Sequence, residues 1–330
     1  MHTRNALVFP DDTSKTILDA IDAATKTLRI KMFIFSDSQL VNAVIAAKLR
    51  GVEVRVMLNR ARRDGEEENE ETRKSLLAAG IEVVDSNPEF VVTHEKSMTV
   101  DDEISFIHSL NWETKNLANT RDYAIVTNYP HDVNEVIAGF EADWRRKKFE
   151  PGRDASLIWC PGNGRDRIAD FIDNATHSLY LQNERYQDLV IIERLVRASK
   201  RGVKIHVMAK APHSLKADKL IEGVEGLRIM DDVGIKIHML KHLKLHGKIL
   251  LADYVRAVVG SINLTAGSFD DRRELAIELN DDAAIDRLHG IIKSDWENSH
   301  PMDLSEHGLL DDLKSRIEGA EELLALNPDE

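Results

Sequence analysis

Residues 94–101 read His-Glu-Lys-Ser-Met-Thr-Val-Asp, and residues 246–253 read His-Gly-Lys-Ile-Leu-Leu-Ala-Asp. Each stretch is followed by a Ser-x-Asn triplet, at residues 109–111 and 261–263. The two sets lie 152 positions apart, and the register between them holds without a gap. One copy of so short a pattern is a weak signal, because such motifs recur by chance. Two copies in register indicate a duplicated chain.

The rest of the chain repeats at nearly the same spacing. Residues 50–57 and 201–208 both begin Arg-Gly-Val and lie 151 positions apart. A Pro-Gly pair in residues 149–154 separates the copies and is typical of a chain that leaves a helix. We therefore predict three parts: a first half over 1–150, a second half over 151–300 and a C-terminal helical appendage over 301–330.

Each half combines helical and strand-like patterns. Apolar residues at helical spacing alternate with strand-like runs, which favours a parallel βαβ core followed by short strands with tight connections. The predicted class is α/β, with two similar halves related by a pseudo-twofold axis and a mixed central sheet flanked by helices in each. In the first half we expect strands at 27–35, 52–58, 90–100, 104–109 and 123–127, and helices at 39–50, 66–79 and 130–147.

Composition excludes several classes of protein. The 330 residues include one Cys, so neither an internal disulfide framework nor a four-thiolate zinc site is possible. The N-terminus lacks the apolar segment of a signal peptide, and no apolar run approaches the roughly 20 residues that span a bilayer. A net charge of −13 opposes general affinity for nucleic acids or anionic membranes. We expect a cytoplasmic monomer without a transmembrane segment, which contacts membranes only peripherally.

The first motif places its polar residues at one end of a predicted hairpin. His94 and Lys96 share a face, because residues i and i+2 of a strand project together. Asp101 begins an Asp-Asp pair that suits a hairpin turn. A turn there sets His94 opposite about Ser109, with Asn111 beside it.

The second motif repeats this arrangement. His246 and Lys248 share a face, and a turn at Asp253 sets His246 opposite about Ser261, near Asn263.

An acidic residue opens the next strand in each half, at Asp122 and Glu274. We expect each half to collect a histidine, a lysine, an asparagine and a carboxylate at one edge. The carboxylates would orient the imidazoles and stabilise their charged forms.

These side chains suit a phosphate better than a metal. Each histidine stands two residues from a lysine whose charge repels a cation, so we expect neither a metal nor another cofactor. Lys96, Lys248, Asn111 and Asn263 would bind the nonbridging oxygens of a phosphodiester. A neutral histidine would attack phosphorus while a protonated one gives a proton to the leaving oxygen. Because each half holds one histidine, we expect the site at the interface of the halves.

The paired motifs resemble those of the phospholipase D superfamily, whose signature is a duplicated His-Lys-Asp motif with Ser-x-Asn and a later acidic residue. The resemblance covers nearly the whole chain and implies a metal-independent phosphodiesterase with a covalent phosphohistidine intermediate. It implies that His94 is the nucleophile and that His246 is the general acid and then the base. The predicted catalytic set is His94, His246, Lys96, Lys248, Asp122 and Glu274. The predicted supporting residues are Asp101, Asp253, Ser109 and Ser261.

Simpler interpretations stay open for some of these residues. For Asp101 and Asp253, a purely structural role in a turn or salt bridge is as good an interpretation as a role in the site. The two asparagines could merely end strands. The glycine that usually precedes Ser-x-Asn is present as Gly260, but His108 replaces it in the first half. A packed histidine is the simpler interpretation of His108, whose role the sequence does not decide.

The expected substrate is a phospholipid, by hydrolysis or by transfer of a phosphatidyl group. The acidic composition and the 5% aromatic content disfavour a nucleic acid, which such proteins bind through basic and stacking surfaces. A nuclease that acts on single strands or exposed ends is the alternative, because a narrow basic groove suffices for it.

Overall fold

The computed structural model describes residues 2–60, 68–152, 156–210, 220–305 and 307–308. The elements of the first half are β1 (Arg4–Phe9), α1 (Lys15–Ala23), β2 (Thr27–Met32), α2 (Ser38–Leu49), β3 (Glu53–Leu58), α3 (Glu70–Ala78), β4 (Glu82–Asp85), β5 (Val92–Thr93), β6 (Ser97–Val100), β7 (Ile104–His108), α4 (Thr114–Ala118), β8 (Thr120–Thr127) and α5 (Pro130–Trp144).

The second half repeats this order. Its elements are β9 (Leu157–Cys160), α6 (Gly164–Asp173), β10 (Ser178–Gln182), α7 (Leu189–Lys200), β11 (Lys204–Met208), α8 (Leu220–Asp232), β12 (Lys236–Leu240), β13 (Lys244–Leu245), β14 (Ile249–Ala252), β15 (Arg256–Gly260), α9 (Ala266–Asp270), β16 (Arg272–Leu279), α10 (Asp282–Glu297) and β17 (Ser299–Pro301). Equivalent helices begin alike: the Asp37 side chain caps α2 by accepting from two backbone amides of the first turn, and the Asp188 side chain caps α7 by accepting from one.

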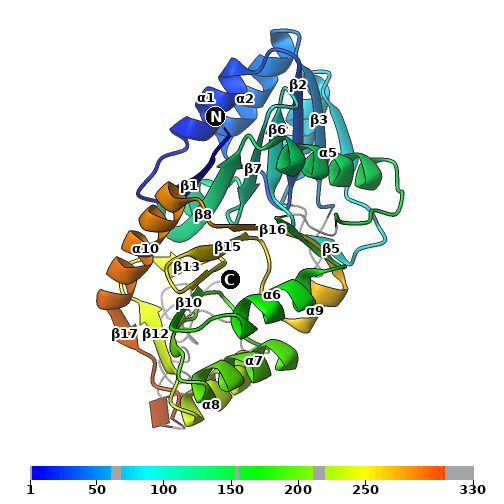
Figure 1. Ribbon diagram of the computed structural model, residues 1–330. Helices are drawn as coiled ribbons and strands as arrows, with labels where there is room; N and C mark the ends of the chain where they lie inside the picture. The colour runs from blue at the N-terminus through cyan, green and yellow to red at the C-terminus, as the bar shows by residue number, and fades with distance from the viewer. Residues whose placement is uncertain (1, 61–67, 153–155, 211–219, 306, 309–330) are drawn as a thin grey trace, which may run out of the picture.

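Two mixed sheets form the centres of the two lobes in Figure 1. The first has the order β1-β8-β7-β6-β2-β3-β4, and the second has β17-β12-β11-β10-β14-β15-β16-β5, with β9 also on β16. Strands β2, β3 and β4 pair in parallel, whereas β2, β6, β7 and β8 form an antiparallel run. The second sheet repeats this pattern, which confirms the predicted α/β fold with two similar halves.

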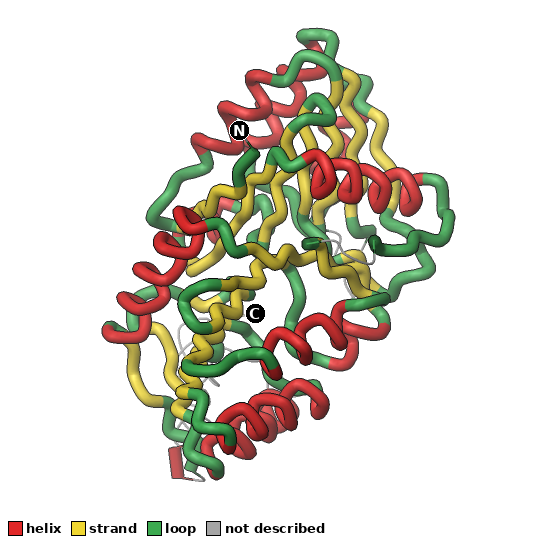
Figure 2. Tube along the Cα trace, viewed as in Figure 1, coloured by secondary structure: helices red, strands yellow, loops and turns green. Residues whose placement is uncertain are grey.

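Helices flank the strands of both lobes (Figure 2). One cluster in each half packs the first two helices against the sheet, with Ile21 and Val44 among its members in the first half. A third cluster contains residues of both halves, such as Tyr123 and Leu275. This cluster fixes the two sheets against each other, so residues at their facing edges hold a defined geometry.

The predicted hairpin turns are confirmed. Asp101 has a φ of 54° and Asp253 a φ of 53°, in the left-handed region that such turns use. The predicted strand at 90–100 is wrong, because the chain leaves the sheet between β5 and β6. The interruption falls at His94, Glu95 and Lys96, which are buried and polar. Their side chains need hydrogen-bond partners that a continuous strand at 90–100 would not offer them.

The predicted C-terminal helical appendage falls mainly outside the described residues. Before that point β17 adds to the edge of the second sheet beside β12. Met302 and Leu304 then pack into the core of the second half.

Candidate active site

One short strand of each half pairs with a strand of the other half. β5 of the first half pairs in parallel with β16, and β13 of the second half pairs in parallel with β8. The registers place Thr93 beside Arg273 and Leu245 beside Arg121. The residue that follows each short strand is a motif histidine. Each histidine therefore arrives next to the acidic residue of the opposite half.

His94 is held by the second half. Its backbone amide donates to the carbonyl of Arg273 at 2.8 Å, and its Nδ1 atom lies 2.9 Å from Glu274 Oε2 and 3.2 Å from the carbonyl oxygen of Ser261. The Glu274 carboxylate and the Ser261 backbone carbonyl both accept hydrogen bonds, so Nδ1 carries the proton and Nε2 presents its lone pair. His94 was predicted to lie opposite about Ser109, and this is wrong, because the strand that carries it crosses to the other half.

His246 is held by the first half in the same way. Its Nδ1 atom lies 2.8 and 3.1 Å from the two carboxylate oxygens of Asp122. Asp122 also accepts from the Ser109 hydroxyl at 2.6 Å and from the Thr120 hydroxyl at 2.5 Å. The sequence predicts a histidine and a carboxylate at one edge of each half, and the structure pairs each carboxylate with the histidine of the opposite half, so the carboxylates are exchanged.

The motif lysines lie close to their histidines. Lys96 Nζ donates to the carbonyl of His94 at 2.5 Å, and Lys248 donates to the carbonyl of His246. Lys96 is fully buried, and Lys248 is 2% exposed. The charges of both lysines act on His94, and two cationic side chains near one imidazole suit the binding of a phosphate.

The surroundings of His94 favour its neutral form. Burial, followed by the charges of Lys96 and Lys248, lowers the pKa of His94 well below 6.5. Burial also raises the pKa of Glu274, an effect that the charge of Lys96 opposes. A neutral imidazole with a free Nε2 has the form of a nucleophile.

The pKa of Asp122 is shifted in the opposite direction from that of Glu274. Burial alone would raise the pKa of Asp122, but the charge and hydrogen bond of His246 lower it below its ordinary value. Asp122 therefore stays ionised beside the His246 ring.

The serines of the Ser-x-Asn triplets brace the acid-bearing strands. The Ser109 hydroxyl accepts from the amide of Tyr123 at 2.8 Å while it donates to Asp122. The Ser261 hydroxyl accepts from the amide of Leu275 at 3.1 Å. Both serines thus link the triplet to the acid-bearing strand, and their supporting role in catalysis stays a prediction.

Asn111 and Asn263 are each 5% exposed. Asn111 donates to Glu113 Oε2 at 3.1 Å, and the amide oxygens of both asparagines have no hydrogen-bond partner in the described part of the chain. Their predicted binding to phosphate stays a prediction.

The turn aspartates act on the backbone. Asp101 accepts from the amides of Lys26 and Thr27 at 2.7 and 2.9 Å, and Asp253 accepts from the amide of His177 at 2.7 Å. Burial raises the pKa of Asp253, but its backbone hydrogen bonds lower it to about 2. These contacts favour the turn interpretation.

His108 is a packed residue. Its ring stacks on Phe106 with 5.9 Å between ring centroids and meets Trp112 edge-on. Burial lowers the pKa of His108 to about 3, so the ring is neutral. In the second half, a Cβ atom on Gly260 would lie 2.3 Å from the carbonyl oxygen of Leu275, so that position admits only glycine.

Two buried ion pairs that sequence reasoning missed join the halves beside the site. Arg273 binds Asp143 through Nε and Nη2 at 2.9 and 2.7 Å, and Arg121 binds Asp295 at 2.9 and 2.8 Å. Each arginine precedes the acidic residue that holds a histidine. Their recurrence at equivalent positions of both copies, 152 positions apart, is a usable signal.

Sequence reasoning also missed Glu184, which lies beside the second His–Lys pair. Its carboxylate Oε2 atom lies 2.9 Å from Lys248 Nζ and 3.9 Å from His246 Nε2. Burial raises the pKa of Glu184, but the charges of Lys248 and His246 outweigh it and hold the pKa well below 4.5.

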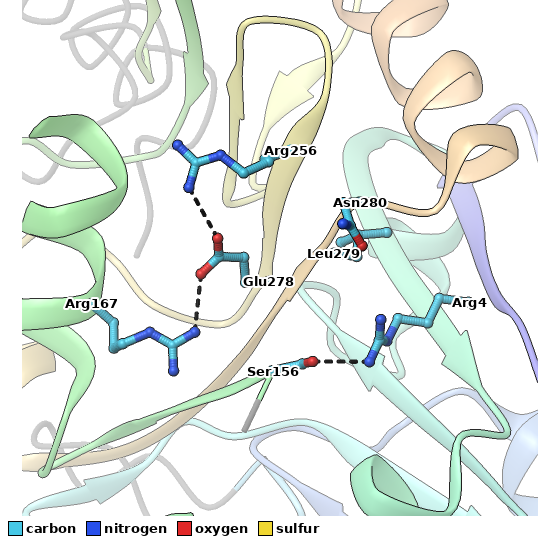
Figure 3. Close-up of a pocket in the computed structure, with 7 residues that line it drawn as sticks. All are labelled: Arg4, Ser156, Arg167, Arg256, Glu278, Leu279 and Asn280. Carbon is cyan, nitrogen blue, oxygen red and sulfur yellow. Dashed lines mark hydrogen bonds and ion pairs between the residues drawn. The ribbon is translucent and has the colours of Figure 1, made fainter. Parts of the chain in front are cut away.

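Figure 3 shows a different pocket, of about 250 Å³. No predicted site residue lines it. Its arginines are paired: Arg4 binds Asp132 and Asp281, while Arg167 and Arg256 share Glu278. Its lining residues are Arg4, Ser156, Arg167, Arg256, Glu278, Leu279 and Asn280.

Within the described residues, no three His, Cys, Asp or Glu side chains are grouped so as to hold a metal ion. No helix in that same part of the chain is long and apolar enough to cross a membrane.

The duplicated fold and the doubled His–Lys site define a phospholipase D-like protein. The chain belongs to the phospholipase D superfamily of phosphodiesterases and phosphatidyltransferases, because the family described as "Cardiolipin synthase, PLD-like domain" matches residues 17–144 and 168–296. This confirms the resemblance drawn from the paired motifs.

Individual relatives have different names. The chain is 25% identical to cardiolipin synthase B of Escherichia coli strain K12, over 85% of this chain and 78% of that protein. It is 26% identical to a polyphosphate kinase of Vibrio parahaemolyticus, over 92% of this chain but only 45% of the kinase. The phosphatidylserine synthase of Haemophilus influenzae has the same fold, with a TM-score of 0.70, 10% identity and coverage of 97% of this chain and 94% of that one.

Proposed function

We propose that this protein is a metal-independent phosphodiesterase of the phospholipase D type that hydrolyses or transfers a phosphatidyl group. The observation that carries the proposal is the exchange of carboxylates, because Glu274 orients His94 and Asp122 orients His246 across one interface. One chain supplies both halves of the site, so the proposed active form is a monomer.

In the first proposed step His94 is the nucleophile. Its Nε2 lone pair attacks phosphorus and forms an N–P bond, while the bond from phosphorus to the leaving oxygen breaks. His246 gives its Nε2 proton to that oxygen. Lys96 and Lys248, with the Asn111 and Asn263 amides, would hold the nonbridging oxygens as negative charge develops.

In the second step His246 acts as the base. It takes a proton from water or an acceptor alcohol, whose oxygen attacks phosphorus as the N–P bond breaks. Hydrolysis and transfer differ only in that acceptor.

Three observations favour a phospholipid over a nucleic acid. Cardiolipin synthase B and phosphatidylserine synthase are named for lipid products. The net charge of −13 disfavours a polyanionic partner. Leu189 and Val190 are 74% and 42% exposed at the start of α7, soon after Glu184, where they can contact a lipid surface. The proposed location is the cytoplasm, with peripheral contact with a membrane.

Trapping the intermediate tests this function. The variant His246→Asn lacks the base for the second step but should still react with a phosphatidyl ester of p-nitrophenol, whose leaving group needs no acid. We expect a phosphatidyl adduct on His94, seen by peptide mass spectrometry after denaturation at alkaline pH, where phosphohistidine survives.

The matched control is His94→Asn, which should form no adduct. An oligonucleotide 5′-(p-nitrophenyl phosphate) ester serves as the second substrate. An adduct from the oligonucleotide alone would show a nuclease. An adduct on His246 in the His94→Asn variant would reverse the two histidine roles. No adduct from either substrate in His246→Asn would contradict the covalent mechanism.

A further inference from the structure

The two halves of the site differ at one pair of equivalent positions. Phe33 and Glu184 lie 151 positions apart, just after the ends of β2 and β10. The Phe33 ring packs against the His94 ring with 4.9 Å between centroids and lies 5.1 Å from Lys96 Nζ. An apolar ring thus adjoins the first His–Lys pair, and a carboxylate adjoins the second.

Glu184 lies where substrate is expected. His246 Nε2 and Lys248 Nζ are the two atoms that the proposed reaction directs at the phosphodiester. Glu184 Oε2 is 3.9 Å from the first and 2.9 Å from the second, so it stands within hydrogen-bonding range of the place an anionic oxygen must take. A bound phosphate on Lys248 therefore has a carboxylate as its immediate neighbour.

A second difference keeps this carboxylate in position. Lys210 Nζ lies 3.2 Å from Glu184 Oε1, whereas the equivalent residue of the first half is the uncharged Asn59. The side chain of Glu184 is only 12% exposed. Its negative charge is weakly screened by solvent there, so it acts on whatever binds beside it.

We propose that Glu184 makes this site selective for singly charged phosphodiesters over doubly charged phosphomonoesters. This inference rests on the proposed function and adds to it the residue that sets its charge selectivity. A phosphodiester carries one negative charge, which the nearby ammonium groups balance. A phosphomonoester carries nearly two at neutral pH, and its second charge meets the carboxylate.

The selectivity has a consequence for turnover. Hydrolysis of a phosphatidyl ester leaves a phosphomonoester, phosphatidate, in the site. Repulsion from Glu184 disfavours this product more than the substrate, so it limits product inhibition.

Direct binding tests the inference without turnover. The probes are methyl phosphate, mostly a dianion at about pH 7, and dimethyl phosphate, a monoanion, each titrated into the full chain by NMR or calorimetry. The variant Glu184→Gln keeps the shape of the side chain and removes its charge. We expect it to bind methyl phosphate about tenfold or more tightly than wild type, and dimethyl phosphate with less than about threefold change.

The matched control is Glu193→Gln on α7, a half-exposed glutamate paired with Arg197. It should change neither affinity. Equal gains for both probes in Glu184→Gln, or no gain for either, would overturn the selectivity while dimethyl phosphate binding leaves the proposed function standing. Failure of both probes to bind wild type and Glu184→Gln would overturn the inference together with the proposed phosphate site.

A second variant protects the test against misfolding. Glu184→Phe introduces the residue type that the first half has at the equivalent position, where Phe33 packs beside a His–Lys pair. Relative to wild type, its affinity should rise more for methyl phosphate than for dimethyl phosphate, as in Glu184→Gln. A Glu184→Phe protein with native circular dichroism but without this selective gain would contradict the charge argument.

Discussion

The Nδ1 atom of His94 lies 2.9 Å from the carboxylate of Glu274, although the two residues are 180 positions apart. Their counterparts His246 and Asp122 make the same contact in the opposite direction. Neither half therefore holds a complete histidine–carboxylate pair, and the proposed chemistry requires both halves in contact. The relationship follows from the exchange of two short strands, β5 and β13.

Replacing Glu274 tests the importance of this contact. Glu274→Gln keeps the size of the side chain but removes the charge that stabilises positive charge on His94. We expect kcat for phosphodiester hydrolysis to fall by about 10²–10⁴-fold, measured by steady-state assay. Glu278→Gln, on the same strand, is the control and should retain activity within about threefold. A kcat near that of wild type in Glu274→Gln would remove the carboxylate from the mechanism.

The pH dependence of substrate capture should report Lys96. Burial lowers the pKa of Lys96 to about 7, so in the free protein this side chain loses its positive charge as pH rises through neutrality. Its phosphate affinity is present below that pH and is lost above it, and we expect kcat/KM to fall about tenfold for each unit above about pH 7. Bound phosphate favours the charged lysine, so the limb for kcat should lie at higher pH.

The variant Lys96→Arg supplies the control for this profile. Arginine stays protonated throughout the range, so the variant should lose the alkaline limb even if altered geometry lowers its rate. An unchanged limb in Lys96→Arg would assign the titration to another group.

Removing metal ions should leave activity intact. Lys96 and Lys248 supply the positive charge that a metal would otherwise bring to the phosphate. We expect the same rate, within about 20%, before and after dialysis against excess EDTA. Loss of activity that Mg²⁺ or Ca²⁺ restores would show that the lysines are insufficient.

Several features of this fold can be predicted from sequence because they depend on local or repeated signals. The Asp101-Asp102 turn follows from residues that tolerate a positive φ, and the duplication follows from spacing alone. These signals place the histidines and lysines correctly near one interface. They also identify the acidic residue that opens each following strand.

The exchange of carboxylates could not be read in the same way. The strand that decides it, Val92–Thr93, is two residues long and has no periodicity to show which sheet it joins. Its partner is set by the packing of whole lobes. Glu184 had a usable signal, because a position-by-position comparison of the repeats sets this charge against the aromatic Phe33. A search confined to shared residues overlooks it.

The buried pair between Arg273 and Asp143 should determine how firmly the halves are joined. Asp143 accepts from Arg273 and also from Lys31 Nζ at 2.7 Å, and all three side chains are almost wholly buried. Asp143→Ala leaves two cations without this partner, so we expect the free energy of unfolding to fall by about 3–5 kcal/mol, measured by urea denaturation. Activity should fall too, because the Arg273 carbonyl holds the backbone of His94. Asp19→Ala removes an exposed ion pair with Lys15 and should cost less than about 1 kcal/mol. If Asp143→Ala were no more destabilising than this control, the pair would not hold the interface together.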